Sequence, residues 1–287
     1  MRHQAWMEVG PVTFRVGSAW GAPVRALRGL YSAYPQGDGV ADYTVRLEPA
    51  GPGRRWVRPS VRIGGDYVLP DAAPLPLAHG LVAAEMAMNL QMALGERRFL
   101  LLHAASVEKD GRAMILTGES GAGKSTLSAM LGERGWRFMG DEFALLEPRT
   151  GLLHPFPRPV SLKNEAIAVM AAEVAADRFG PAMEGTPKGR IQHLRPNRAA
   201  IARMSEAARP ALILFPRFGK ARDLRPVGPA EAFMRLTQAS TNYVAMGERG
   251  YDALTGLVRD CPAAAADYPD AAAAFELIDL LWAELGR

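Results

Sequence analysis

Cysteine is nearly absent from this sequence. Cys261 is the single cysteine among 287 residues, which excludes an intramolecular disulfide and a cysteine-based zinc cluster. Cys261 precedes Pro262 and lies near an apolar stretch with helical spacing. A free cysteine in such a setting is usually a packing residue. We interpret Cys261 in this way, with a reactive thiol as the alternative.

Long apolar runs are missing too. No segment approaches the roughly 20 apolar residues that a membrane-spanning helix needs, and residues 1–6 lack the basic-then-apolar pattern of a secretory signal. We therefore expect a cytoplasmic protein with no membrane partner. The apolar content of 48% and charged content of 22% are ordinary for a chain that buries a core.

Charge of one sign is not in large excess. The net charge of +4 is too small to argue for a nucleic-acid partner, so we expect none. The distribution is uneven, because ten basic residues between Lys188 and Arg225 are opposed only by Glu206 and Asp223. This segment either faces nucleotide phosphates, an acidic partner or a neighbouring subunit, or it is a solvated basic surface.

Alternating apolar residues predict a small β-rich unit at residues 1–72, followed by a larger domain at residues 73–287. In the first unit we expect strands at 12–16, 43–47 and 56–63 and a helix at 24–34. In the second we expect helices at 77–94, 165–179, 230–238, 251–257 and 270–285, strands at 100–107, 113–117 and 211–215, a hairpin at 149–151, a loop at 155–164 and a flexible connector at 180–189.

One segment matches the phosphate-binding pattern G-x-x-x-x-G-K-[ST]. It consists of Gly118, Glu119, Ser120, Gly121, Ala122, Gly123, Lys124, Ser125 and Thr126. A buried strand is predicted before it and a helix after it. Its glycines would let successive backbone N–H groups face phosphate oxygens at a helix N-terminus. The pattern predicts a bound nucleoside triphosphate, which we take to be ATP, together with Mg²⁺. Lys124 would reach the outer phosphates and Ser125 would bind the metal; a chance glycine-rich turn is the alternative.

Two further positions carry candidate chemistry. Asp141 and Glu142 follow a short predicted strand, where a carboxylate can bind magnesium or accept a proton from a hydroxyl; a pair of surface acids is the alternative. His103 lies on the strand that an expected turn at Asp110–Gly111 folds back beside the phosphate loop. It is either a neighbour of the phosphates or a core histidine.

The segment from His103 to Glu142 resembles the catalytic core of HPr kinase/phosphorylase and its relatives. It has a strand histidine, then G-x-S-G-x-G-K-S, then residues 134–142 in the place of the family pattern R-G-H-x-x-x-A-D-D. The resemblance implies an α/β fold of the α+β, mixed-sheet kind: a phosphoenolpyruvate-carboxykinase-type P-loop core like the C-terminal domain of HPr kinase, with a small β-rich N-terminal unit. It also implies that Asp141 is the base, Glu142 the acid on the magnesium side, and His103 a phosphate neighbour.

The whole chain resembles the HprK-related kinases, whose best understood distant cousins phosphorylate a serine on peptide natural-product precursors. Glu142 stands where HPr kinases have a second aspartate, Trp136 replaces a histidine, and residues 184–190 occupy the region of the family's E-x-R-G signature. The resemblance therefore implies kinase chemistry, without HPr as the acceptor and without the reverse phosphorylase reaction. Because HPr kinases form oligomers, we expect self-association.

The predicted function is an ATP- and Mg²⁺-dependent kinase acting on a hydroxyl, with serine or threonine of a peptide or protein as the acceptor. Four loop-borne cations are candidates to clamp the phosphoryl group or an acidic substrate, or else belong to ordinary surface loops; they are Arg158, Lys163, Lys188 and Arg190. The alternatives are a nucleotide-binding assembly or sensor module, a small-molecule kinase or carboxykinase-like enzyme, and a nucleic-acid binder.

Overall fold

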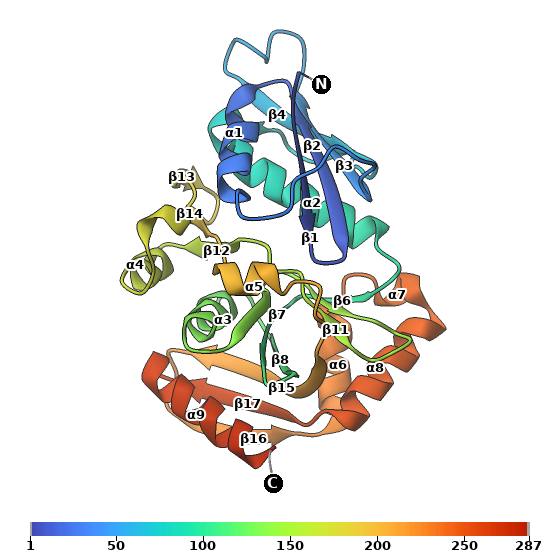
Figure 1. Cartoon of the computed structure of the whole chain (residues 1–287), viewed down its shortest axis with the longest axis vertical. Helices are drawn as coiled ribbons and strands as arrows, with labels where there is room; N and C mark the ends of the chain where they lie inside the picture. The colour runs from blue at the N-terminus through green and yellow to red at the C-terminus, as the bar shows by residue number, and fades with distance from the viewer. Residues whose placement is uncertain (1, 286–287) are drawn as a thin grey trace. The chain divides into compact units, whose positions relative to one another are not determined.

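The computed structural model describes residues 2–285 as a mixed α/β chain with several mixed sheets (Figure 1). The chain forms two compact units, one from residues 1–96 and 158–201 and the other from residues 97–157 and 202–287. The predicted boundary between residues 72 and 73 falls inside the first unit. No helix within residues 2–285 has both the length and the apolar character needed to cross a membrane.

The first unit contains a five-stranded sheet in the order β1-β2-β3-β4-β5. Its strands are β1 (His3–Val9), β2 (Val12–Ser18), β3 (Tyr43–Pro49), β4 (Ser60–Gly65) and β5 (Leu75–Pro76). Helices α1 (Gly21–Leu30) and α2 (Gly80–Gly95) pack against each other, and α2, which follows the 3₁₀ turn η1 (Leu77–His79), also packs on β3 and β4. This packing keeps α2 with the N-terminal strands rather than with the phosphate loop.

A second, three-stranded sheet completes the first unit, in the order β12-β14-β13. It consists of β12 (Val160–Lys163), β13 (Met183–Thr186) and β14 (Gly189–Leu194), and it is accompanied by α4 (Glu165–Ala171), η2 (Ala176–Arg178) and α5 (Arg198–Ala202). The sequence interpretation was wrong here, since it expected a loop at 155–164, a connector at 180–189 and one helix over 165–179. The positive φ angles of Gly185 (67°) and Gly189 (82°) permit the turn between β13 and β14.

The second unit is built on a six-stranded sheet in the order β16-β17-β15-β8-β7-β9. Its strands are β7 (Ala104–Lys109), β8 (Arg112–Thr117), β9 (Arg137–Gly140), β15 (Arg209–Phe218), β16 (Asp223–Val227) and β17 (Ala263–Tyr268), and beside it lies a small sheet of β6 (Leu100–Leu102), β10 (Ala144–Leu146) and β11 (Leu153–His154). The predicted hairpin at Arg149–Gly151 is confirmed by the antiparallel pairing of β10 with β11.

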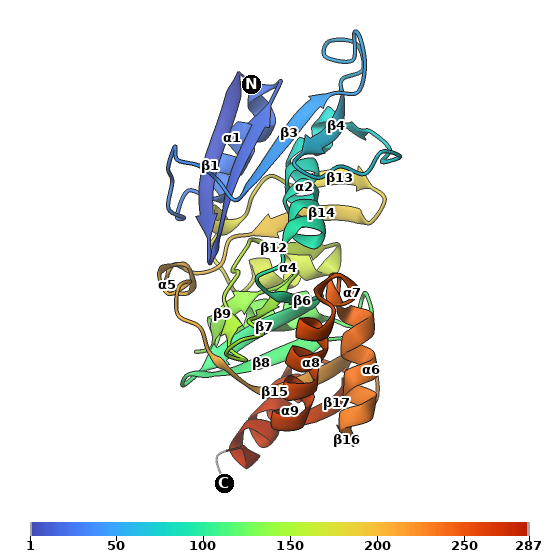
Figure 2. The same cartoon turned by 90° about the vertical axis from the view of Figure 1, so that its right-hand side faces the viewer.

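Both faces of the large sheet are covered. Helix α3 (Lys124–Glu133) and α9 (Ala271–Glu284) contribute to the core on one face, whereas α6 (Pro229–Ala239), α7 (Tyr243–Met246) and α8 (Glu248–Asp260) contribute to the core on the other; α6 and α8 run side by side (Figure 2). In β8, Ala113 and Ile115 join one core while Met114 and Leu116 join the other. A strand covered on both faces requires this continuous apolar run.

Several elements differ from their predictions. The expected strand at 56–63 begins only at Ser60, and Trp56 lies in the preceding loop with 76% of its surface exposed. The alanine run at 263–266, to which no element was assigned, lies in β17, which is parallel to β15 and antiparallel to β16. The hairpin turn at Asp110–Gly111 is confirmed, with positive φ angles of 54° and 76° at its two residues.

Candidate functional site

Three candidate segments of the second unit meet at one edge of the large sheet. The phosphate loop follows the carboxyl end of β8. Strand β7 is antiparallel to β8 and pairs Ala104 with Thr117, so His103 lies at the same edge. Strand β9 is antiparallel to β7 and pairs Gly140 with Ser106, so the chain that continues into Asp141 and Glu142 also emerges there. The carboxyl ends of parallel strands are where α/β sheets bind ligands.

Two of the predicted site residues are in contact at this edge. The Nδ1 atom of His103 lies 3.8 Å from Oε2 of Glu142, and both side chains are close to half exposed, at 47% and 43%. Asp141 is buried. The structure thus brings His103 and the acidic pair to the sheet edge that carries the phosphate loop. The predicted hairpin implied this position for His103.

The loop has the backbone of an anion cradle. Gly118, Gly121 and Gly123 have positive φ angles of 150°, 87° and 89°, and Gly123 is the residue before α3. The buried ammonium of Lys124 donates to the carbonyl oxygens of Gly118 (2.8 Å) and Glu119 (2.9 Å), so it is held inside the loop. An ammonium group beside backbone N–H groups at a helix N-terminus fits a phosphate.

Gly123 is also required by close packing. A Cβ atom at this position would lie 3.1 Å from Cβ of Phe218 and 3.5 Å from Oη of Tyr268.

Gly140 is crowded as well, because a Cβ atom there would lie 3.0 Å from the carbonyl oxygen of Phe156 and 3.1 Å from that of Phe143. Gly140 therefore lets the chain turn closely before the acidic pair, a role that sequence reasoning missed.

The oxygen donors at this edge suit magnesium. A hydroxyl and carboxylates are the ligand types that Mg²⁺ prefers, and Mg²⁺ usually shares its coordination with substrate phosphates; Ser125, Asp141 and Glu142 supply these types. Within residues 2–285, no group of three or more histidine, cysteine, aspartate and glutamate side chains is arranged to hold a metal by itself. Because Mg²⁺ takes oxygen ligands and usually shares them with substrate phosphates, the three donors fit a metal that is bound together with a nucleotide.

A pocket of about 780 Å³ adjoins the phosphate loop. Residues 117–122 and His103 line one part of it, and four basic side chains line another: Arg217, Lys220, Arg225 and Arg235. Sequence reasoning counted the first three within the basic segment but did not group them, and it missed Arg235 altogether. The concentration of basic residues between Lys188 and Arg225 was the sequence signal that could have indicated a cationic wall in this pocket.

Asn242 is a buried side chain whose role sequence reasoning missed. Its Oδ1 accepts a hydrogen bond from the backbone N–H of Leu101 (2.9 Å), and its Nδ2 donates to the carbonyl of Phe99 (2.9 Å). In addition, the backbone N–H of His103 donates to the carbonyl of Ala239 (2.7 Å). The end of α6 and the chain that follows it therefore hold β6 and the backbone of His103 in place.

The predicted loop cations all belong to the first unit. Arg158 is buried, and its guanidinium contacts Glu85, Asn89 and the hydroxyl of Tyr31 (3.3 Å). Burial acts to lower the pKa of Arg158, but the Glu85 carboxylate raises it above its ordinary value. Arg158 thus lies in a loop, as the sequence indicated, but it is a buried partner of Glu85.

The other three cations lie in or beside the small sheet of the first unit. Arg190 forms an exposed ion pair with Glu184 (3.1 Å). Lys163 ends β12, and Lys188 lies in the turn between β13 and β14. Their sequence-based role as a phosphate clamp stays a prediction.

No protein-family model matches this chain, and no curated protein matches it. The interpretation of the site therefore depends on its own residues and geometry.

Proposed function

We propose that this chain is an ATP- and Mg²⁺-dependent kinase that transfers the γ-phosphoryl group to a hydroxyl, with serine or threonine of a peptide or protein as the acceptor. We further propose that the second unit is a phosphate-loop core of the HPr kinase type. The observation that carries the proposal is the common sheet edge of the phosphate loop, His103 and the Asp141–Glu142 pair. Phosphoryl transfer needs these parts: a phosphate cradle, metal ligands and a base.

Each residue has a distinct task in this reaction. Bound ATP supplies the phosphoryl group, and Mg²⁺ offsets the charge on its oxygens. Lys124, held within the loop by two carbonyl oxygens, places a positive charge beside the outer phosphates. Asp141 accepts the proton of the acceptor hydroxyl as the hydroxyl oxygen bonds to the γ-phosphorus. At the same time the bond from that phosphorus to the β,γ-bridging oxygen breaks, and ADP leaves. Ser125 and Glu142 provide oxygen ligands for the metal.

His103 orients Glu142 in this proposal. Its contact with Glu142 supports a role in positioning that carboxylate beside the phosphates. The backbone of His103 is fixed independently, since its N–H donates to Ala239 and its carbonyl accepts from the hydroxyl of Thr117 (3.3 Å). A fixed backbone with an exposed imidazole is the arrangement expected of a side chain that meets a ligand.

The test is intact-mass analysis of candidate peptides and cell-lysate proteins after incubation with ATP and Mg²⁺. The chain is compared with its Lys124→Ala and Asp141→Asn variants. The matched control is Lys109→Ala, because Lys109 lies at the hairpin turn, at the other end of β7 from the phosphate loop. Loss of a general base typically lowers the rate by about 10²- to 10⁴-fold.

A gain of one phosphoryl mass that disappears in both site variants and persists in Lys109→Ala would establish the kinase. If ATP binds but no acceptor gains mass, the kinase proposal is wrong, and a nucleotide-binding module becomes the better interpretation.

A further inference from the structure

The pocket beside the phosphate loop has a floor built from one row of residues. In this row, Phe215 of β15 pairs with Ala265 of β17, and Ala265 pairs with Arg225 of β16. Directly paired residues point to the same face of a sheet, and all three line the pocket. The small side chain of Ala265 leaves space between Phe215 and Arg225.

Helix α6 adds a second guanidinium over this floor. Arg235 lies above the ring of Phe215, 4.7 Å from its centroid, and it also lines the pocket. An arginine packed on an aromatic face has a restricted orientation. The pocket therefore presents two guanidinium groups from different elements, Arg225 on β16 and Arg235 on α6.

These two arginines share one carboxylate. Arg225 Nη2 lies 3.2 Å and Arg235 Nη2 lies 2.5 Å from the same oxygen, Oε1 of Glu231. Two guanidinium charges against one carboxylate leave a net positive charge on this wall. Two further cations line the same pocket. Arg217 is paired with Asp267 (Nε–Oδ1 2.7 Å), and Lys220 is exposed.

We infer that this pocket takes the hydroxyl acceptor of the proposed kinase, and that the acceptor carries an anionic group, a carboxylate or a phosphate, that Arg225 and Arg235 bind. The inference rests on the proposed function. The phosphate loop and Lys124 already suit the nucleotide phosphates. Arg225 and Arg235 lie on other elements, β16 and α6, and are therefore available to a second ligand. Guanidinium groups recognise carboxylates and phosphates through paired hydrogen bonds, so the excess charge selects an acceptor with an anion near its hydroxyl.

The experiment uses matched probes of the two anion sources. One pair is a fluorescein-labelled peptide with a single serine among glutamates and the same peptide with glutamines. The other pair is glycerol 3-phosphate and glycerol. Binding of each probe is measured without ATP, by anisotropy or calorimetry, and binding of ATP with Mg²⁺ is measured separately. The full-length chain is used throughout.

Two variants change the pocket, and two further variants serve as controls. Arg225→Gln/Arg235→Gln removes both guanidinium groups, and Ala265→Leu fills the floor without changing charge. Arg222→Gln is the matched control, because Arg222 is also exposed and ion-paired, with Glu276 (2.7 Å), but is outside the pocket lining. Lys124→Ala removes the loop ammonium and leaves the pocket cations in place.

We expect the chain to bind at least one anionic probe more tightly than its neutral partner. The double variant should weaken that binding by about tenfold or more, the scale of a lost charge-assisted hydrogen bond. Ala265→Leu should also weaken it, because the larger side chain occupies the space between Phe215 and Arg225. In both variants ATP affinity should stay within about twofold. Arg222→Gln should change neither the affinity for the anionic probe nor the affinity for ATP. Lys124→Ala should abolish ATP binding and leave the affinity for the anionic probe unchanged. Preference for the peptide or for glycerol 3-phosphate identifies the source of the anion.

Two results would overturn the inference: equal affinity for the anionic and neutral probes, or parallel loss of ATP and probe in the double variant, which would assign the pocket to the nucleotide. A failure of the proposed function looks different. In that case the anionic probes bind as described but gain no phosphoryl mass when ATP and Mg²⁺ are added.

Discussion

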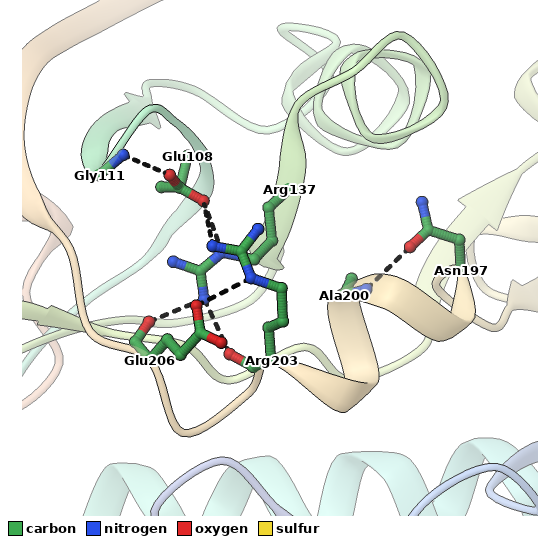
Figure 3. Close-up of polar contacts among 7 residues, drawn as sticks. All are labelled: Glu108, Gly111, Arg137, Asn197, Ala200, Arg203 and Glu206. Carbon is green, nitrogen blue, oxygen red and sulfur yellow. Dashed lines mark hydrogen bonds and ion pairs between the residues drawn. The ribbon is translucent and has the colours of Figure 1, made fainter.

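The guanidinium of Arg137 and the carboxylate of Glu108 form a buried ion pair, with Nε 2.6 Å from Oε2 (Figure 3). Arg137 is in β9 and Glu108 is in the neighbouring strand β7. The same guanidinium donates through Nη1 to the carbonyl oxygens of Arg203 (2.8 Å) and Glu206 (2.7 Å). One side chain thus fixes the edge strand that leads to Asp141 and the segment that leads into β15.

Removal of this guanidinium should destabilise the protein strongly. Arg137→Met leaves Glu108 buried without its main partner, a change that typically costs about 3–5 kcal/mol. Urea unfolding of the two proteins measures the difference. The comparison is Arg222→Met, which breaks the exposed pair with Glu276 and should cost no more than about 1 kcal/mol. Equal costs for the two variants would refute the importance of the buried pair.

The same pair predicts a pH dependence of stability. Burial acts to raise the pKa of Glu108, but the hydrogen bonds from Arg137 and from the Gly111 N–H, with the charges of Arg137 and Arg203, bring the pKa below its ordinary value of 4.5. As pH falls below about 4.5, Glu108 binds a proton in the unfolded chain before it does so in the folded one. The free energy of unfolding therefore decreases as pH falls from about 4.5 through the lower pKa of Glu108 in the folded protein. Above that range the contribution is fully present.

Glu108→Gln removes this titration. Its free energy of unfolding should be lower at neutral pH and should fall less steeply than that of the parent chain between pH 4.5 and pH 3. Urea midpoints measured across pH 3 to 7 provide the check, within the range in which both proteins unfold reversibly. Parallel curves for the two proteins would contradict the assignment of the acid-sensitive stability to Glu108.

Local signals explain what the sequence could predict. The phosphate loop and the Asp110–Gly111 hairpin are each encoded by residues that are neighbours in sequence. The position of His103 beside the phosphate loop could therefore be predicted from the sequence. The strand at 263–266 was missed because alanine has little intrinsic strand preference. It forms a strand because β15 and β16 pair with it and because both of its faces are covered.

The burial of Arg158 has a similar cause. The sequence indicates a loop-borne cation at this position, but its partner Glu85 is distant in sequence and buried with it. The pocket cations Arg225 and Arg235 come from a strand and a helix that meet only in the folded unit. Contacts between segments distant in sequence depend on the packing of whole elements, which periodicity and composition do not specify.

Cys261 should be inert in the folded protein. Its thiol is buried in the core beside α8, and burial, followed by the nearby charge of Asp260, raises its pKa to about 12. Because the thiolate is the reactive form, we expect no reaction with Ellman's reagent at pH 8 in native buffer and one equivalent in urea. Rapid labelling of the native protein would restore the alternative of a reactive thiol.

Gly123 provides a test of the phosphate loop that does not depend on any acceptor. Gly123→Ala places a Cβ atom 3.1 Å from Phe218 Cβ at a φ of +89°, so the loop must shift and ATP affinity should fall by about tenfold or more. Gly151→Ala is the matched control, because its φ is +68° but nothing lies within 4 Å of the new atom.

Both substitutions introduce left-handed strain of about 1–2 kcal/mol, which urea unfolding should detect in each variant. Calorimetric titration with ATP and Mg²⁺ then separates strain from function, because only Gly123 lies in the loop that closes on Phe218 and Tyr268. If Gly123→Ala binds ATP as tightly as Gly151→Ala does, the loop around Gly123 does not hold the nucleotide phosphates, and the close packing at that glycine serves stability alone.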